Sequence, residues 1–167
     1  MKLSDFMSEV TRISSPSGEV TAERMVLAID CSDTGNATKV GDYDIASVHV
    51  ENLGAAISSE TVDKNYLYEG KMTIKTDAKR TFALTGQRYL GDAFQDFACS
   101  HKIKYGKGDA CKRKYVYFNI DSGKGEQGEC TIVTNKDGSA AAGNPTDVEI
   151  AITSVGIPAE YTYSEGV

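Results

Sequence analysis

The chain has 167 residues, of which 40% are hydrophobic and 25% charged, and its formal net charge is −6. A chain of this length buries roughly 70% of its unfolded surface, which predicts a single folded domain and argues against a disordered protein. No segment approaches the ~20 apolar residues that a membrane helix requires. Residues 1–16 contain Asp5 and Glu9 but no apolar core. We therefore expect no export signal, and a chain that stays in the cytoplasm or leaves it by lysis or a dedicated machine.

The first third of the chain predicts short strands between polar segments. Residues 1–22 are rich in Ser, Thr and Glu and predict a flexible N-terminal arm. Apolar residues predict one strand at 25–30 and a second at 43–53, separated by a polar turn. Residues 54–65 predict a long polar loop, and loops of that length are usually functional or disordered.

Period-two alternation of apolar and polar residues predicts two further strands, at residues 71–76 and 80–85. In a half-buried strand the alternate apolar residues face the core. The residues expected to point inward are Met72, Ile74, Phe82 and Leu84.

One clear helix start lies at Asp92. Its carboxylate is placed to accept the free N–H groups of a first helical turn, and Gln95 completes the spacing of a capping box. The helix is expected at about residues 92–101. Residues on its buried face should be Phe94, Phe97, Ala98 and His101.

The remaining segments return to the strand pattern. Strands are expected at 112–120, 130–134 and 147–155, with a turn at 123–128 and a loop at 135–145. Seven or so short strands and one helix predict a mainly β fold, a β-sandwich or barrel with one flanking α-helix. Residues 23–167 then form a single domain.

No catalytic, cofactor-binding or metal-binding constellation emerges, so we expect neither an enzyme nor a cofactor. The glycines at 123–128 match G-x-G-x-x-G, but a strand follows them where a dinucleotide site requires a helix. His49 and His101 are the only histidines. The four cysteines predict free thiols. A zinc site at Cys99, His101 and Cys111 is the alternative, although it lacks a second close ligand pair.

Charge is arranged in blocks along the chain. Residues 1–70 hold 5 basic and 12 acidic groups, residues 71–114 hold 11 and 4, and residues 115–167 hold 2 and 8. Such blocks suit copies that meet acidic surface to basic surface, whereas the alternative is that lysines at sheet edges keep a monomer soluble. The candidate inter-subunit contacts are Lys112, Arg113 and Lys114. Nearby Tyr115 and Tyr117 also fit a nucleic-acid-binding strand, but an acidic chain argues against tight binding.

Residues 86–97 resemble a segment of the tail tube proteins of bacteriophages with long, non-contractile tails. That family commonly shows G-x-R, then G-D-P-x-Q-D and a large apolar residue. The residues that match are Gly86, Arg88, Gly91, Asp92, Gln95, Asp96 and Phe97. Ala93 stands where a proline is usual, and both residues suit the first helical position. The likeness extends over residues 25–158, but its specific part is this segment.

The resemblance implies a major tail tube subunit, a structural protein of the virion tail assembled in the bacterial host cytoplasm. Family members form stacked hexameric rings whose inner sheets join into a barrel, and DNA passes through the channel during ejection. The expected partners are further copies of the chain, the tail terminator, the tape measure and tail-tip proteins, and transient DNA, with no membrane. The N-terminal arm and the loop at 54–65 would stack the rings, and an acidic lining would repel phosphate.

A second hypothesis is a monomeric β-sandwich binding module that recognises carbohydrate or a cell surface. Its stacking faces would be supplied by Tyr66, Tyr68, Tyr115 and Tyr117. The absence of tryptophan counts against it.

Overall fold

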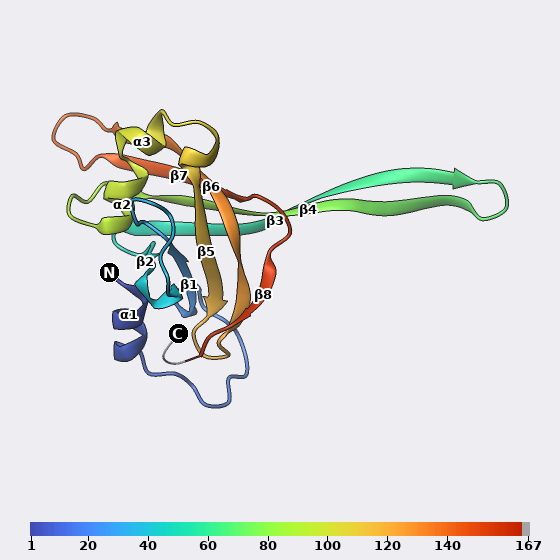
Figure 1. The fold of residues 1–167 in the computed structure, drawn as a ribbon, viewed down its shortest axis with the longest axis horizontal. Helices are drawn as coiled ribbons and strands as arrows, with labels where there is room; N and C mark the ends of the chain where they lie inside the picture. Colours follow the sequence, from blue (N-terminus) through green and yellow to red (C-terminus); the bar gives the residue numbers. More distant parts are fainter. Residues whose placement is uncertain (165–167) are drawn as a thin grey trace.

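The computed structural model describes residues 1–164 as a β-rich body from which one long hairpin projects (Figure 1). Its strands form one antiparallel sheet in the order β2-β1-β5-β6-β7-β4-β3, with β8 beside β6. The strands are β1 (Met25–Ile29), β2 (Asp44–Ile45), β3 (Val50–Tyr66), β4 (Gly70–Gln87), β5 (Lys112–Asn119), β6 (Lys124–Ser139), β7 (Asp147–Ser154) and β8 (Ala159–Thr162). The helices are α1 (Leu3–Glu9), α2 (Ala93–Ala98) and α3 (His101–Lys104), with short 3₁₀ turns η1 (Ala22–Arg24), η2 (Val40–Asp42) and η3 (Gly108–Cys111).

The sheet folds over on itself because β6 belongs to both of its halves. Residues 124–131 of β6 pair with β5 and β8, whereas residues 130–139 pair with β7. We call β2, β1, β5, β8 and the first part of β6 the covered half. The second part of β6, β7 and the body parts of β4 (81–87) and β3 (50–57) form the bare half. The mainly β fold, with two packed sheet layers and flanking helices, agrees with the predicted sandwich.

Two apolar clusters hold the layers together. The larger one lies between the halves and includes Leu27, Phe82 and Ile152, with α2 and α3 contributing Phe94 and Ile103. The smaller one lies on the other face of the covered half, where Val26 and Phe118 meet α1 and η2. The covered half is therefore buried on both faces, which explains why β1 and β5 are apolar on both.

The prediction of a flexible N-terminal arm is wrong for residues 3–9, because these residues form the helix α1. Leu3 and Met7 are four residues apart, so they share one helical face, and both are buried in the smaller cluster. The Leu3 N–H donates to the Tyr43 carbonyl at 2.9 Å, and Lys2 pairs with the buried Asp44 at 2.8 Å. Leu3, Phe6, Met7 and Val10 have the i, i+3, i+4, i+7 spacing of an apolar helical face, a signal that the polar composition of residues 1–22 obscured.

Residues 10–21 cross the surface of the body and are held by Asp121. The Arg24 guanidinium and the Ile13 N–H, which donates at 2.9 Å, lower the pKa of Asp121 to about 2. Because the carboxyl of an unfolded Asp has a pKa of ~3.9, this contribution to stability is complete above that pH and disappears as pH falls towards 2.

This attachment predicts a pH-dependent opening of residues 10–21. Pepsin cleavage of this segment, measured against an unstructured peptide of the same sequence, is expected to be strongly protected at pH 4 and to lose protection by pH 2. The Asp121→Asn variant should already be cleaved at pH 4. Equal protection of both proteins across this pH range would contradict the assignment.

The loop expected at 54–65 is wrong, because these residues belong to β3. Strands expected at 71–76 and 80–85 are one continuous strand, β4. Phe82 and Leu84 are buried as predicted, but Met72 and Ile74 are 48% and 40% exposed. The strand expected at 43–53 is also interrupted, since β2 ends at Ile45 and β3 begins at Val50, and between them His49 has a φ of 52°.

The C-terminal strands are closer to expectation. The strands expected at 112–120 and 147–155 are confirmed as β5 and β7, and the alternate apolar residues of β7, Val148, Ile150 and Ile152, are buried. The prediction of a turn at 123–128 is wrong, because β6 already begins at Lys124. The sequence did not predict the short strand β8. Among residues 1–164, no helix has both the length and the apolar character needed to span a bilayer.

Candidate assembly surfaces

The predicted helix start is confirmed at Asp92, whose Oδ2 accepts the Gln95 N–H at 3.0 Å. The helix is shorter than expected, because α2 ends at Ala98 and α3 begins only at His101. Phe94 and Ala98 are buried, whereas Phe97 is half-buried and His101 is exposed. The prediction of a buried face is therefore correct for Phe94 and Ala98, partly correct for Phe97 and wrong for His101.

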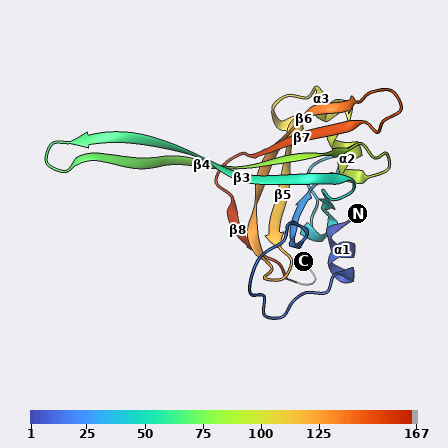
Figure 2. The ribbon, with the colours of Figure 1, turned by 180° about the vertical axis from the view of Figure 1, so that it is seen from behind.

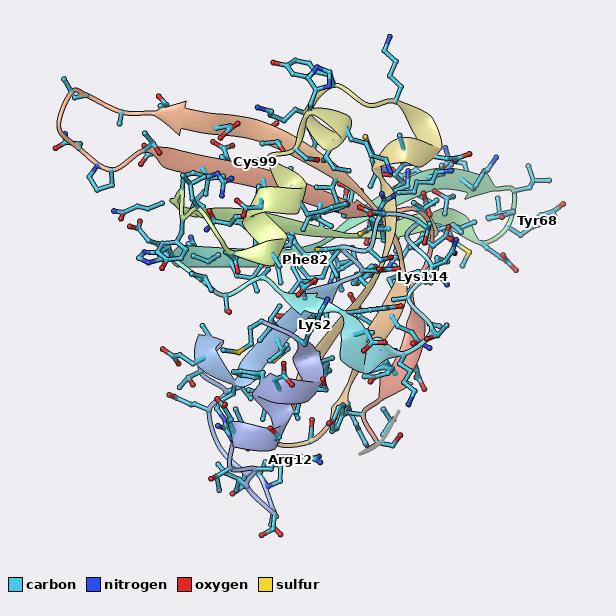
Figure 3. The ribbon with its side chains drawn as sticks, turned by 60° about the vertical axis from the view of Figure 1, so that its left-hand side comes forward. Lys2, Arg12, Tyr68, Phe82, Cys99 and Lys114 are labelled. Carbon is cyan, nitrogen blue, oxygen red and sulfur yellow. The ribbon has the colours of Figure 1, made fainter. Side chains whose placement is uncertain are left out.

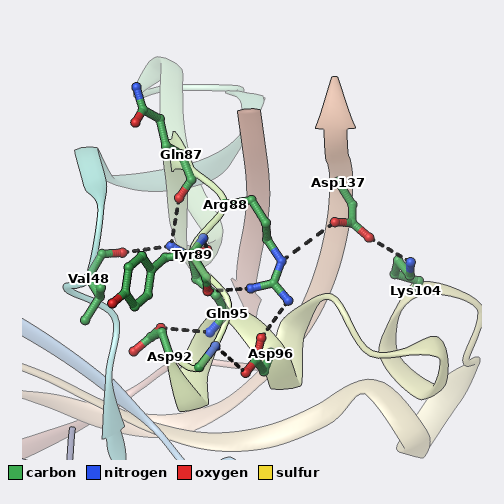
Figure 4. Close-up of polar contacts among 10 residues, drawn as sticks. Val48, Gln87, Arg88, Tyr89, Asp92, Gln95, Asp96, Lys104 and Asp137 are labelled. Carbon is green, nitrogen blue, oxygen red and sulfur yellow. Dashed lines mark hydrogen bonds and ion pairs between the residues drawn. The ribbon is translucent and has the colours of Figure 1, made fainter. Parts of the chain in front are cut away.

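The Gln95 side chain does not complete the capping box. It is 1% exposed and its Nε2 donates to the carbonyls of Val48 at 2.7 Å and Gln87 at 3.1 Å. Its Oε1 accepts the Tyr89 N–H at 2.9 Å (Figure 4). One amide thus joins the segment before β3, the end of β4 and the start of α2.

Ion pairs on the surface hold together the same region, where the end of β4 meets the start of α2. Arg88 pairs with Asp96 at 2.6 Å and lies 3.9 Å from Asp137, which also pairs with Lys104 at 2.7 Å (Figure 4). Asp96 also accepts the N–H of Gly91, whose φ is 97°. The motif residues therefore come together as a structural joint of α2, α3, β4 and β6.

The two remaining motif residues are packing positions. A Cβ on Gly86 would collide with the His49 carbonyl oxygen, so the strands can approach only with Gly here. The ring of Phe97 lies under the Arg113 guanidinium, 5.0 Å from ring centroid to Cζ. Nothing in this motif is arranged for chemistry on a ligand.

The three basic candidate contacts differ in their surroundings. Lys112 pairs with Asp109 at 2.7 Å. Arg113 is 5% exposed and donates to the Ala110 and Lys112 carbonyls at 3.2 and 2.6 Å. Its charge is therefore directed into the subunit. Lys114 is exposed.

The cysteines and four of the tyrosines are the remaining residues for which the sequence suggested a site. All four cysteines are free, and burial raises the pKa of the Cys130 thiol to about 12. Within residues 1–164, no three His, Cys, Asp or Glu side chains lie together as a metal site. Of the four tyrosines considered for stacking, Tyr115 and Tyr117 are 1% and 8% exposed, so they are core residues, while Tyr66 and Tyr68 lie on the hairpin.

Residues 58–79 form the projecting hairpin, which has no buried side chain and reaches about 30 Å from the body at ~3.3 Å per residue of strand (Figures 1 and 2). Its register places alternate cross-strand pairs on opposite faces. One face, here called the apolar face, carries Val62, Lys64, Tyr66, Met72 and Ile74. The other, the polar face, carries Thr61, Asp63, Asn65, Lys71, Thr73 and Lys75.

The tip of the hairpin is also apolar. Leu67 is 88% and Tyr68 is 94% exposed, and Tyr68 lies at the outer end of the hairpin in Figure 3. A contiguous apolar surface of this kind, on an element that packs on nothing in its own subunit, is typical of a protein–protein contact. Sequence reasoning missed it because the alternation resembles that of a core strand.

The outer face of the bare half is a second candidate surface. Rows of paired residues across its strands are small or uncharged and lie at least partly exposed: Gly54, Ala83, Ala151 and Val133 in one row, and Ala56, Thr81, Thr153 and Thr131 in the next. Its charged residues include Lys136 and Glu149, which pair at 3.1 Å, and the exposed Asp147 on the same face of β7. Beside this face, the body part of β3 is the terminal strand of the sheet, so one side of its backbone has no strand partner within the described chain.

Comparisons with known proteins bear on the fold. No protein-family model and no curated protein sequence matches the chain. Similar solved structures include the following two. One is described as the tail of an empty GTA particle with C6 symmetry, at a TM-score of 0.61 and 17% identity, covering 87% of this chain and 100% of that one. The other is the virion of a native gene transfer agent (GTA) particle, at a TM-score of 0.58 and 14% identity, with the same coverage. At these identities the likeness establishes a shared fold.

Proposed function

We propose that this chain is the major subunit of a phage-like tail tube, which assembles as stacked, hexameric rings around a channel for DNA. The observation that carries the proposal is the projecting hairpin: a long, apolar-faced element that contributes nothing to its own core. The shared fold with chains of a tail and a virion particle supports the same function. The protein would lie in the virion tail after assembly in the host cytoplasm, and it needs no enzymatic activity.

Ring closure would use the sheet edges. An exposed edge strand is a template for pairing with another chain, and a barrel removes such edges. The body part of β3 (50–57) is such an edge. If each copy adds its bare half to the next, six copies close into one continuous wall, with the outer face of the bare half lining the channel. Exposed Lys114 stays a proposed contact at the subunit boundary.

The channel lining would be close to neutral, in place of the acidic lining expected from composition. Binding to DNA requires clustered Lys and Arg that release counterions from phosphate. The rows of Gly, Ala and Thr on the bare half offer no such cluster, and Lys136 is paired with Glu149. DNA would therefore pass without being held.

Stacking would use the projecting hairpin. A head-to-tail contact between different surfaces of identical subunits does not close, so it repeats into an open stack. The tail terminator would end this stack, the tape measure would set its length and the tail-tip proteins would nucleate it. The alternative function, a monomeric carbohydrate-binding module, is favoured only by the exposed rings of Tyr66 and Tyr68.

The test is self-assembly of the purified chain. Sedimentation velocity and negative-stain microscopy over a concentration series are expected to show rings or hollow tubes that appear above a threshold concentration. A glycan array serves as the second arm. A species that remains monomeric at every concentration and salt, and binds glycans, would overturn the proposal in favour of the binding module.

A further inference from the structure

We propose that the surface of α3 and η3 on one copy packs into the groove between β1 and the start of β3 on the next copy of the same ring. This surface, here called the α3–η3 surface, consists of the exposed side chains of His101, Lys102, Tyr105 and Lys107. The inference rests on the proposed function and deepens it, because it adds a second contact to the shared sheet wall, on the side away from the channel. The positions, the charges and the lining of the two surfaces support it.

The α3–η3 surface lies at the edge of the bare half that β6 forms. Residues 132–139 of β6 pair with β7 but not with β5, so one side of this stretch has no strand partner within the described chain. The helix α3 packs beside this edge, where Lys104 pairs with Asp137 at 2.7 Å. Asp137 stands opposite the buried Val148. The helix therefore covers the face of the bare half that points away from the channel.

The groove lies at the opposite edge of the bare half. It has a volume of about 350 Å³ and is bounded by η1, β1, β2 and the start of β3. Val50 and Leu53 line it, and they stand opposite Gly86 and Leu84 on the face of β4 that carries the core. The groove therefore also opens on the face away from the channel. Figures 1 and 2 show α3 beyond β6 and β7 on one side of the bare half, and α1 beyond β3 on the other.

Sheet pairing within the ring brings these two surfaces together. The strands of the bare half follow one another as β6, β7, β4 and β3, each antiparallel to the last, so β3 of one copy meets β6 of the next as an antiparallel partner. Since α3 lies beside β6 and the groove lies beside β3, the copy that covers the β3 edge also brings its α3–η3 surface to the groove. Each copy uses each surface once, as a closed ring requires.

The two surfaces are complementary in charge. Lys102 and Lys107 are exposed on the α3–η3 surface, whereas Glu23 and Glu51 are exposed at the groove. Opposite charges that meet across an interface fix its register and speed association. The contact therefore gives the basic block of the sequence an acidic partner on the neighbouring copy.

Tyr105 supplies the apolar part of the contact. Its ring is 69% exposed and lies against His101, with the ring centroids 4.9 Å apart. Apolar side chains from several elements line the groove that would receive it: Phe6, Met25, Leu27, Ile45, Val50 and Leu53. Aromatic side chains that enter such pockets carry much of the binding energy of protein interfaces. We therefore expect Tyr105 to be the anchor of the contact.

Charge reversal on each surface tests the contact. Lys107→Glu is expected to raise the concentration at which monomers assemble at least ~tenfold, because the new carboxylate faces Glu23 and Glu51. Lys124→Glu reverses another exposed lysine, at the end of β6 far from α3, and should assemble like the parent protein. Combining Lys107→Glu with Glu23→Lys and Glu51→Lys should restore the threshold to within about threefold of the parent value. Sedimentation velocity over a concentration series measures each threshold.

Two changes at Tyr105 test the anchor and locate its partner. Tyr105→Ser should raise the same threshold at least ~tenfold, and the melting temperature of dissociated subunits should not change, because the ring is exposed in the single subunit. A photo-crosslinking benzophenone side chain at position 105 identifies the surface that receives it. In rings made from isotopically labelled and unlabelled copies, mass spectrometry should find residue 105 of one copy joined to residues 22–27 or 45–53 of another.

The outcomes separate this contact from the proposed function. Rings in which position 105 cross-links only to other surfaces would overturn the contact, and so would Lys107→Glu and Tyr105→Ser proteins that assemble at the parent concentration. An equal loss of assembly in Lys124→Glu would contradict it as well, since any exposed lysine would then have the same effect. Failure of the glutamate reversals to restore assembly would overturn the groove as the partner of Lys107. A parent protein that forms neither rings nor tubes would overturn the proposed function instead.

Discussion

A subunit whose projecting hairpin is replaced by a two-residue Asn-Gly turn is expected to fold normally and to build no tubes. Ile57 and Arg80 are paired across the two strands, so a tight hairpin turn can join them. None of the removed residues, 58–79, is buried. Arg80 is retained, and it stabilises this end of the body through Glu126 at 2.7 Å and the ring of Tyr117 at 5.0 Å.

Two measurements on the shortened protein separate folding from stacking: the melting temperature reports folding, and sedimentation velocity reports stacking. Its melting temperature should stay within ~5 °C of the parent value, because a change of ~1 kcal/mol moves a domain of this size by only a few degrees. In sedimentation velocity it should stop at rings at concentrations where the parent protein forms tubes. Tubes of normal length built by the shortened protein would show that the hairpin is not the ring-to-ring contact.

The second large effect is expected at the structural joint. Gln95→Leu should lower the free energy of unfolding by about 3–5 kcal/mol, because it leaves the Val48 and Gln87 carbonyls and the Tyr89 N–H without their buried partner. The joint also holds the segment that leads into β3. The variant is therefore expected to assemble poorly even where it is folded.

Urea denaturation of dissociated subunits measures this effect. Gln87→Leu is the matched control, since it changes a half-buried glutamine nearby but leaves the backbone carbonyl that Gln95 uses. The control should cost less than ~1 kcal/mol, as is usual for a substitution away from a buried network. Equal loss of stability in the two variants would show that the amide of Gln95 is not the centre of the joint.

Local chemistry in the sequence was sufficient to predict several elements. Asp92 was predictable as a helix cap because its carboxylate accepts a free N–H of the first helical turn, which is a local interaction. The strand β7 was predictable because its apolar residues alternate and one of its faces is buried. Gln95 was identified as important, but its partners, Val48 and Gln87, are distant or outside the helix. Spacing within one helix could not show them.

The assembly surfaces were the least predictable part. Met72 and Ile74 alternate as core residues do, and nothing in the sequence distinguishes a strand that faces its own core from one that faces a neighbour. Residues 54–65 form a strand because β4 satisfies their backbone, although their side chains are mostly polar. The blocks of charge along the sequence could not show which charged side chains lie on the surface. Arg113, for example, belongs to the basic block but is buried, and its burial depends on the tertiary fold.

Image reconstruction of the particles formed by the purified chain is the most direct test of the central claim. The expected particle is a hollow, six-fold tube in which the outer faces of the bare halves line the channel as one continuous wall. The hairpin of each copy should cross into the next ring. Particles with the bare halves on the outside, or with hairpins that contact nothing beyond their own ring, would contradict it.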